Sequence, residues 1–128
     1  MRTVLRNGVV YEPVAGEHLG ERTVVIDDGT IVEVVEGEWF GECDVDLDAR
    51  GRHVLPGFID AHVHLSIASM DLAGLAQEWE FERALTVAAL SEATVRRGFT
   101  TVRDTGGDLR GLKQSMRRGL CGGPRIVS

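Results

Sequence analysis

The spacing of apolar and polar residues changes character near Pro56 and so divides the chain into two parts. Before this point apolar and polar residues alternate, which is the period of half-buried strands, and turn-forming residues are frequent. Residues 3–11 are rich in Val and Leu around Asn7 and Gly8, which predicts a strand interrupted by a tight turn or a bulge. In residues 44–48 Asp alternates with Val and Leu, which predicts a short half-buried strand with its acidic side chains outward.

The strongest local signal in this first part is a predicted hairpin. Residues 23–27 and 30–35 are two β-branched runs that flank Asp28 and Gly29. An Asp-Gly pair between such runs predicts a two-residue turn, because that turn requires positive φ at both central residues. Together with the other strands, the hairpin predicts that residues 1–55 form a small β-sheet or sandwich.

After Pro56 the pattern becomes strand, helix, strand, helix, strand. The predicted elements are a strand at 57–64, a helix at 76–97, a strand at 99–103, a helix at 108–120 and a strand at 125–128. Strands that alternate with helices indicate parallel pairing through crossover connections, and therefore an α/β fold for this part.

The ends and the buried face of the two helices are also predicted. Gly98 stands where a C-terminal cap of the first helix is expected, and Asp108 is a candidate N-cap for the second. The second helix is expected to break at residues 122–124 (Gly-Gly-Pro). An apolar stripe of roughly helical period predicts the buried face of the first helix, and its members are Phe81, Leu85, Ala88, Ala89 and Val95.

Composition and charge exclude several classes of protein. Hydrophobic residues make up 43% and charged residues 27% of the 128 residues, as in globular domains. The net charge of -6 argues against a nucleic acid partner, which requires a positive surface. No apolar run reaches the length of about 18 residues that a membrane helix needs. Cys43 and Cys121 form no disulfide framework, so we expect a reduced, cytoplasmic protein.

The most informative stretch is the end of the strand predicted at 57–64, where two histidines are separated by one residue. Because successive side chains of a strand point to opposite faces, Asp60, His62 and His64 are predicted to share one face. Neutral imidazole is a common ligand of zinc and of other borderline divalent metals. A His-x-His pair also occurs by chance, but the Pro-Gly entry, the apolar strand and the crossover downstream favour a metal site at the carboxyl end of a barrel strand.

Most of the chain resembles a known superfamily. Residues 55–64 (Leu-Pro-Gly-Phe-Ile-Asp-Ala-His-Val-His) resemble the first-strand signature of the amidohydrolase superfamily, and residues 51–57 resemble the segment that leads into its barrel. Residues 98–107 (Gly-Phe-Thr-Thr-Val-Arg-Asp-Thr-Gly-Gly) and 123–126 (Gly-Pro-Arg-Ile) are similar to the second and third strands of imidazolonepropionase-like and prolidase-like amidohydrolases.

The resemblance implies an architecture. Residues 1–55 would form an N-terminal β-sandwich segment of the composite-type domain, and residues 56–128 would begin the barrel of a metal-dependent hydrolase. A complete TIM (β/α)8 barrel needs roughly 250 residues. We therefore expect only its first β-α-β-α-β part, truncated after the third strand.

The resemblance also implies a reaction. In this superfamily the first-strand histidines bind one or two divalent metals, and zinc is the metal expected here. The metal activates water for attack on a carbon–nitrogen bond. Of the functional residues of the superfamily, only the two first-strand histidines have counterparts in this sequence, and these are His62 and His64. No catalytic residue beyond these metal ligands is expected. The substrate would be a small-molecule amide or cyclic amide, including dipeptide-like amides.

Later-strand ligands of the superfamily, which include a lysine, two histidines and an aspartate, are not expected here, since Lys113 falls on a predicted helix. The chain alone is therefore expected to be inactive. It is interpreted as a fragment or truncated gene product of a hydrolase, as a non-catalytic remnant or metal-binding and interaction module, or as one half of a split enzyme. A missing barrel half or a homo-oligomer partner would complete the site.

Further polar residues are candidates for a role in the site. Asp60 is either a carboxylate that orients a metal ligand or a structural one satisfied by the backbone. Arg103 and Asp104 end a predicted strand, where they either contact substrate or form an internal ion pair. His18 and His53 are interpreted as surface or packing residues.

Overall fold

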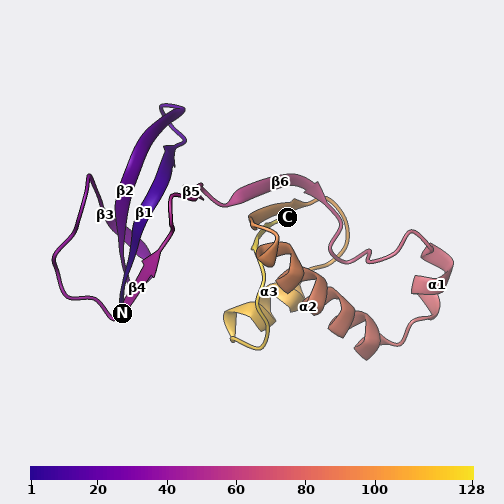
Figure 1. Ribbon diagram of the computed structural model, residues 1–128. Coiled ribbons are helices and arrows are strands. Elements are labelled where there is room, and N and C mark those ends of the chain that lie inside the picture. Colours follow the sequence, from indigo (N-terminus) through magenta and orange to yellow (C-terminus); the bar gives the residue numbers. More distant parts are fainter. The chain divides into compact units, whose positions relative to one another are not determined.

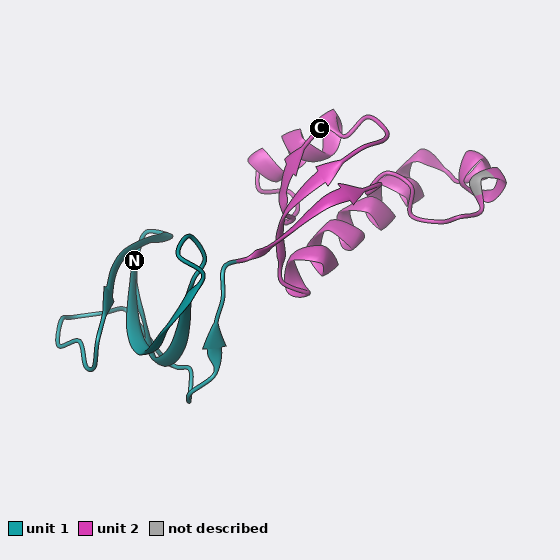
Figure 2. Cartoon of the chain, turned by 90° about the horizontal axis from the view of Figure 1, so that it is seen from above, with its two compact units in different colours: residues 1–56 teal, residues 57–128 magenta. Residues whose placement is uncertain are grey.

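The computed structural model of the chain divides into two compact units, Met1–Pro56 and Gly57–Ser128, which are coloured separately in Figure 2. The structure describes residues 1–71 and 73–128, and gives for residue 72 only its place in a helix. Within these residues, no helix is long and apolar enough to cross a membrane. The two units together form a mixed α/β fold.

The first unit is one twisted sheet built around a long strand (Figure 1). Its strands run in the order β3-β2-β1-β4, and β5 pairs with β1 beyond the end of β4. The strands are β1 (Arg2–Glu12), β2 (Glu17–Asp27), β3 (Thr30–Val35), β4 (Val45–Asp48) and β5 (His53–Val54). Pairing of β1 with β2 and of β2 with β3 is antiparallel, whereas β4 and β5 run parallel to β1.

Both turn signals of this unit are confirmed. Asp28 and Gly29 have φ of 46° and 79° and join β2 to β3 as a tight hairpin. Asn7 has φ of 55°, and the pairing of β1 with β2 shifts between Leu5 and Gly8, so this position is a bulge within one strand rather than a turn.

The first unit has one layer, so the described residues supply no second sheet of a sandwich. Val4, Val10, Val24 and Val25 are buried, whereas most apolar residues of β3 are exposed. The expectation of a half-buried strand at 44–48 is correct for the outward Asp46 but wrong for Leu47, which is 49% exposed. Leu47 is exposed because no layer covers it, since strand alternation alone cannot provide the opposing surface.

The second unit is a parallel three-stranded sheet in the order β6-β7-β8. The strands are β6 (Phe58–Val63), β7 (Phe99–Asp104) and β8 (Arg125–Val127). The helices α1 (Leu72–Gln77) and α2 (Glu80–Arg96) connect β6 to β7, and α3 (Arg110–Arg117) connects β7 to β8 (Figure 1). The predicted alternation of strands and helices and their parallel pairing are confirmed.

Helices α2 and α3 cover the same face of this sheet. The buried cluster consists of Leu65, Val102, Leu109 and Ile126. Leu90 of α2 and Met116 of α3 pack against it. Since Val102 and Ile126 are register partners on β7 and β8, their side chains mark the face that both helices cover.

The helix predicted at 76–97 is α2, which begins later, at Glu80, and a separate short helix, α1, precedes it. Glu78 and Trp79 are both extended, with ψ of 141° and 140°, and they separate α1 from α2. The carbonyl of Leu75 at the end of α1 accepts from the backbone N–H of Glu78 at 3.4 Å and from the side chain of Arg83. Gly98 has φ of 95° directly after α2, so its role in ending that helix is confirmed.

The predicted buried stripe of α2 was wrong. Phe81 and Leu85 are 87% and 73% exposed, whereas Val87 and Ser91 are buried. At about 100° per residue, positions 85 and 87 lie roughly 200° apart around the helix, so only one of the two apolar faces can meet the sheet. The sheet selects the face that carries Val87, Leu90 and Ser91.

Helix α3 is shorter than predicted. It begins after Leu109, and Asp108 lies one position before the cap, where its carboxylate accepts from the backbone N–H of Arg110 at 3.0 Å. Gly119, with φ of 69°, ends the helix: its N–H donates to the carbonyl of Met116, and the N–H of Leu120 donates to that of Ser115. This pair of bonds is a Schellman motif, so the helix stops before residues 122–124.

The corrected face of α2 leads to a stability prediction. Val87→Ala should lower the free energy of unfolding by roughly 1–2 kcal/mol, because it removes buried methyl groups and leaves a cavity. Leu85→Ala should change it by less than about 0.5 kcal/mol, because that larger side chain is already in solvent. Urea unfolding of the 128-residue chain followed by far-UV circular dichroism measures both variants. A loss for Leu85→Ala that equals or exceeds the loss for Val87→Ala would contradict this packing.

Candidate metal centre

The two candidate metal ligands lie side by side at the carboxyl end of β6. His62 is in the strand and His64 follows its last residue. Their ring centroids are 5.3 Å apart and their planes stand at 89°, and both side chains are exposed. The segment therefore presents two imidazoles close to each other.

An irregularity in β6 accompanies this arrangement. Asp60 pairs with Val102 and Val63 pairs with Asp104, so β6 has one residue more than β7 over this stretch. Such a bulge interrupts the alternation of side chains between the two faces of the sheet. The face on which Asp60 lies therefore does not determine the face of His62 and His64. The carboxylate of Asp60 accepts from the backbone N–H of His62 at 3.1 Å. Asp60 therefore contacts the main chain of a candidate ligand.

The end of β7 lies beside the end of β6 and carries the other two candidate residues. Asp104 is 5% exposed, and its carboxylate accepts hydrogen bonds from the backbone N–H groups of Leu65, at 2.6 Å, and Gly106, at 2.9 Å. Arg103 is exposed on the same strand. Among the described side chains no ion pair joins Arg103 to Asp104, so the alternative of an internal pair is not realised.

The chemistry of this centre fits part of a metal site. Two imidazole rings can each offer an unprotonated nitrogen to a divalent metal. In residues 1–71 and 73–128, no group of three or more His, Cys, Asp or Glu side chains is arranged to hold a metal. His62 and His64 are therefore two candidate donors that lie close together, without a third among the described residues.

A second imidazole pair lies in the first unit. The ring centroids of His18 and His53 are 5.7 Å apart, and that of Tyr11 is 5.1 Å from His18. Strand β1 brings them together, since it pairs Tyr11 with His18 on β2 and Val9 with His53 on β5. The sequence held no signal for this contact, because the two histidines are far apart along the chain and meet only through the sheet.

Residues 53–128, which include the whole of the parallel sheet, match the family described as "Amidohydrolase family". This chain belongs to the amidohydrolase family. Solved structures support the assignment. A prolidase crystallised with N-methylphosphonate-L-proline is 38% identical with a TM-score of 0.86, and the match covers 98% of this chain and 31% of that one. A solved amidohydrolase is 33% identical with a TM-score of 0.87, covering 98% of this chain and 30% of that one.

Curated relatives point to the same family. The dihydroorotase of Pelotomaculum thermopropionicum is 36% identical over 102 residues, which are 80% of this chain and 21% of that protein. The dihydroorotase of Anaeromyxobacter dehalogenans is 41% identical over 98 residues, or 77% and 20% of the two chains. This amidohydrolase chain therefore spans about a fifth of the length of the curated relatives that it matches.

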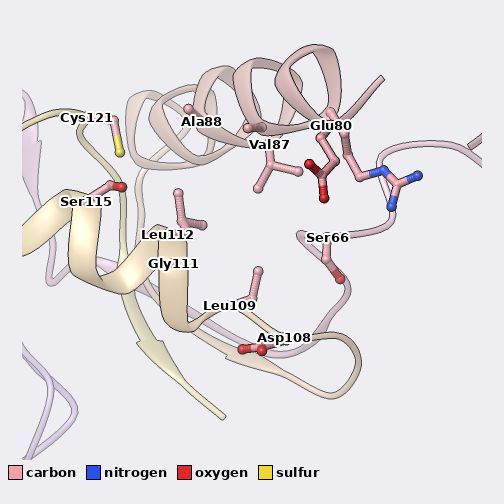
Figure 3. Close-up of a pocket in the computed structure, with 12 residues that line it drawn as sticks. Ser66, Glu80, Val87, Ala88, Asp108, Leu109, Gly111, Leu112, Ser115 and Cys121 are labelled. Atoms are coloured by element: carbon pink, nitrogen blue, oxygen red, sulfur yellow. The ribbon is translucent and has the colours of Figure 1, made fainter. Parts of the chain in front are cut away.

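A cavity of about 470 Å³ lies between α2 and α3 of this amidohydrolase chain, apart from the histidine pair. Figure 3 shows Ser115 and Cys121 at one end and Ser66 toward the other. The lining is mostly apolar side chains such as Val87 and Leu112, and neither His62 nor His64 belongs to it. This cavity is on the helical side of the sheet and is separate from the candidate metal centre.

One carboxyl group near the end of β7 has a shifted pKa. The side chain of Arg110 donates three hydrogen bonds to Asp108, and the backbone N–H of the same residue donates another. Together they lower the pKa of Asp108 to about 2. These donors favour the charged form. Their contribution to stability is complete above the ordinary pKa of 3.8 and is lost as the pH falls through about 2.

Replacing the arginine tests this interaction. In Arg110→Gln the pKa of Asp108 should rise toward 3.8, because its main donor is lost while the backbone donor remains. A carboxyl-carbon NMR titration from pH 6 to about 1.5 measures the midpoint. Lys113→Gln, which removes a charge from the same helix, should leave the midpoint in place. An unchanged midpoint in Arg110→Gln would contradict the assigned cause.

Proposed function

We propose that this chain is the first part of a metal-dependent hydrolase of the amidohydrolase type, in which His62 and His64 are the first two ligands of a divalent metal. The observation that supports it best is the 5.3 Å separation of the two imidazole rings at the end of β6. Family membership supports it independently, through the match over residues 53–128.

We infer that the second unit, together with the residue before it, forms the start of a (β/α)8 barrel, and that residues 1–55 belong to a composite β-domain. The parallel order β6-β7-β8 and the placement of α2 and α3 on one face support this inference. The opposite face carries Phe58 and Phe99, whose ring centroids are 5.7 Å apart. A face with aromatic residues at one end of the strands and histidines at the other is consistent with a barrel interior whose reactive groups lie at the carboxyl ends.

Each residue of the candidate metal centre would have a separate role. A bound divalent metal, for which zinc suits two imidazole donors, would supply an activated water and polarise the scissile carbonyl. His62 and His64 would hold it as neutral imidazoles. Asp60 would fix the backbone of His62 through its 3.1 Å hydrogen bond. Arg103, exposed on the adjacent strand, would be available to a negatively charged part of a substrate.

The proposed substrate is a small molecule with a carbon–nitrogen bond of the amide type. The relatives divide between a prolidase, whose name indicates a dipeptide substrate, and dihydroorotases, whose name indicates a cyclic amide. The prolidase match includes 98% of this chain and the dihydroorotase match 80%. We therefore favour a dipeptide-like amide, with the cyclic amide as the alternative to be assayed in parallel.

A second candidate function is that of a metal-binding or interaction module without catalysis, or of one half of a split enzyme. Within the described residues only two ligands meet, and Lys113 is on α3, where its Nζ lies 3.2 Å from the hydroxyl of Ser128. Purification of the natural protein distinguishes these cases. A 13.9 kDa species without stoichiometric metal would favour the remnant, and co-purification with a larger partner and metal would favour the split enzyme.

Removing either histidine tests the proposed ligands. In the complete enzyme that contains this segment, His62→Ala and His64→Ala should each reduce bound metal well below stoichiometry and lower metal-dependent turnover by at least about a thousandfold, because each removes a direct ligand. Elemental analysis and hydrolysis of an Xaa-Pro dipeptide and of dihydroorotate measure both effects.

His53→Ala is the matched control, because it removes an exposed imidazole from the first unit. It should keep the metal content and turnover of the wild type. The proposal is wrong if either His62→Ala or His64→Ala keeps both.

A further inference from the structure

Both peptide groups that flank His64 are hydrogen-bonded to the end of β7, one to its last residue and one to the residue after it. On one side, the carbonyl of Val63 accepts from the backbone N–H of Thr105 at 3.0 Å. On the other, the N–H of Leu65 donates to the carboxylate of Asp104 at 2.6 Å. The backbone of His64 is thus held from both sides by residues about 40 positions later in the sequence.

The Asp104 carboxylate is the centre of this arrangement. It is 5% exposed, and a charge so far from water requires hydrogen-bond donors of its own. Its two oxygens receive the N–H groups of Leu65 and Gly106, so one side chain bonds the ends of both strands. Neither donor is a side chain, and the bonds therefore fix main-chain position in both loops.

Gly106 contacts the ring of His64 itself. A Cβ placed on Gly106 would lie 2.7 Å from Nδ1 and 3.2 Å from Cε1 of that ring. Those distances are too short for carbon, so any side chain at 106 must displace the imidazole or the loop. The next residue, Gly107, has φ of 87°, and Ser66 donates from its hydroxyl to the carbonyl of Gly106 at 3.1 Å. The loop therefore lies directly against the ring and is held there.

We propose that Asp104 and Gly106 are positioning residues that hold His64 in the orientation of a metal ligand before any metal binds. The inference rests on the proposed function, since it assumes that His64 is a ligand. Asp104 acts on the main chain of His64, and Gly106 limits where its ring can turn. A ligand that is already oriented loses less conformational freedom on binding, which increases metal affinity.

This assignment differs from a contact between Asp104 and substrate. The side chain is buried, and two backbone N–H groups occupy its oxygens. It also differs from a purely structural role, because Gly106 has no side chain to contribute to stability yet lies in contact with the imidazole. A change at 106 should therefore disturb the ring while the fold persists.

Two variants and two matched controls test the proposal in the full 128-residue chain. Asp104→Asn keeps the shape of the side chain but turns one acceptor into a donor that faces a backbone N–H. Gly106→Ala adds one methyl group against the ring. Asp108→Asn makes the same chemical change at an exposed carboxylate that also caps a backbone N–H, and Gly111→Ala adds a methyl group where no atom lies within 4 Å.

The first readout requires no metal. In the wild type, a nuclear Overhauser contact should join the Gly106 α-protons to the His64 ring, and both test variants should weaken it or move the ring signals. The second readout is the zinc concentration at which the His64 ring signals reach half of their shift, with zinc chloride as the probe. Asp104→Asn and Gly106→Ala should raise it about tenfold, as for other residues that orient metal ligands. Both controls should stay within about twofold of the wild type.

The outcomes separate this inference from the proposed function. If His64→Ala leaves the zinc-induced shift of the His62 ring unchanged, His64 is not a ligand and the proposed function fails with it. If His64→Ala abolishes that shift but Asp104→Asn and Gly106→Ala keep wild-type ring signals and zinc affinity, only the positioning role is wrong. If Asp104→Asn does not fold, Gly106→Ala decides alone, and wild-type behaviour of that variant would overturn the proposal.

Discussion

The buried carboxylate of Asp104 connects the ends of two neighbouring parallel strands, and the geometry of the candidate metal centre depends on that connection. Parallel pairing of β6 with β7 places their carboxyl ends at one edge of the sheet. The two loops then share one anion, with Leu65 and Gly106 as its donors. Without this carboxylate the loop after β6 would lose the hydrogen bond that follows His64, and only the bond between Thr105 and Val63 would hold the backbone of His64.

The hydrophobic core supports the same connection. Leu65 is the residue whose N–H binds Asp104, and its side chain is buried in the cluster with Val102 and Ile126. The segment after the two histidines is therefore fixed by both a hydrogen bond and packing. Because a ligand must keep its orientation to be useful to a metal, the stability of this unit and the chemistry of the site are linked through one residue.

Features that depend on a few adjacent residues could be predicted from the sequence. The hairpin at Asp28 and Gly29 follows from the positive φ that its turn requires, and Gly98 ends α2 for the same reason. The alternation of strands and helices after Pro56 predicted the parallel sheet, because parallel neighbours need a long crossover connection, which is usually a helix. The proximity of His62 and His64 could be predicted because the two residues are only two positions apart in an extended segment.

Features set by distant contacts could not be predicted. Apolar residues occupy two sides of α2, and only the sheet determines that Val87 is buried while Leu85 is exposed. The bulge in β6 depends on its register with β7, and the hydrogen bonds of Asp104 join positions 39 residues apart. The contact between Gly106 and the His64 ring is likewise invisible in a sequence, where a Gly-Gly pair indicates only a loop.

A zinc titration that observes the four imidazole rings of the chain separately tests most directly whether His62 and His64 bind one metal ion together. Long-range proton–nitrogen NMR spectra of the nitrogen-15-labelled protein would follow the rings. The signals of His62 and His64 should shift together along a single binding curve, before those of His18 and His53 respond. A shift of only one of the two rings, or two different binding curves, would show that they do not share a metal ion.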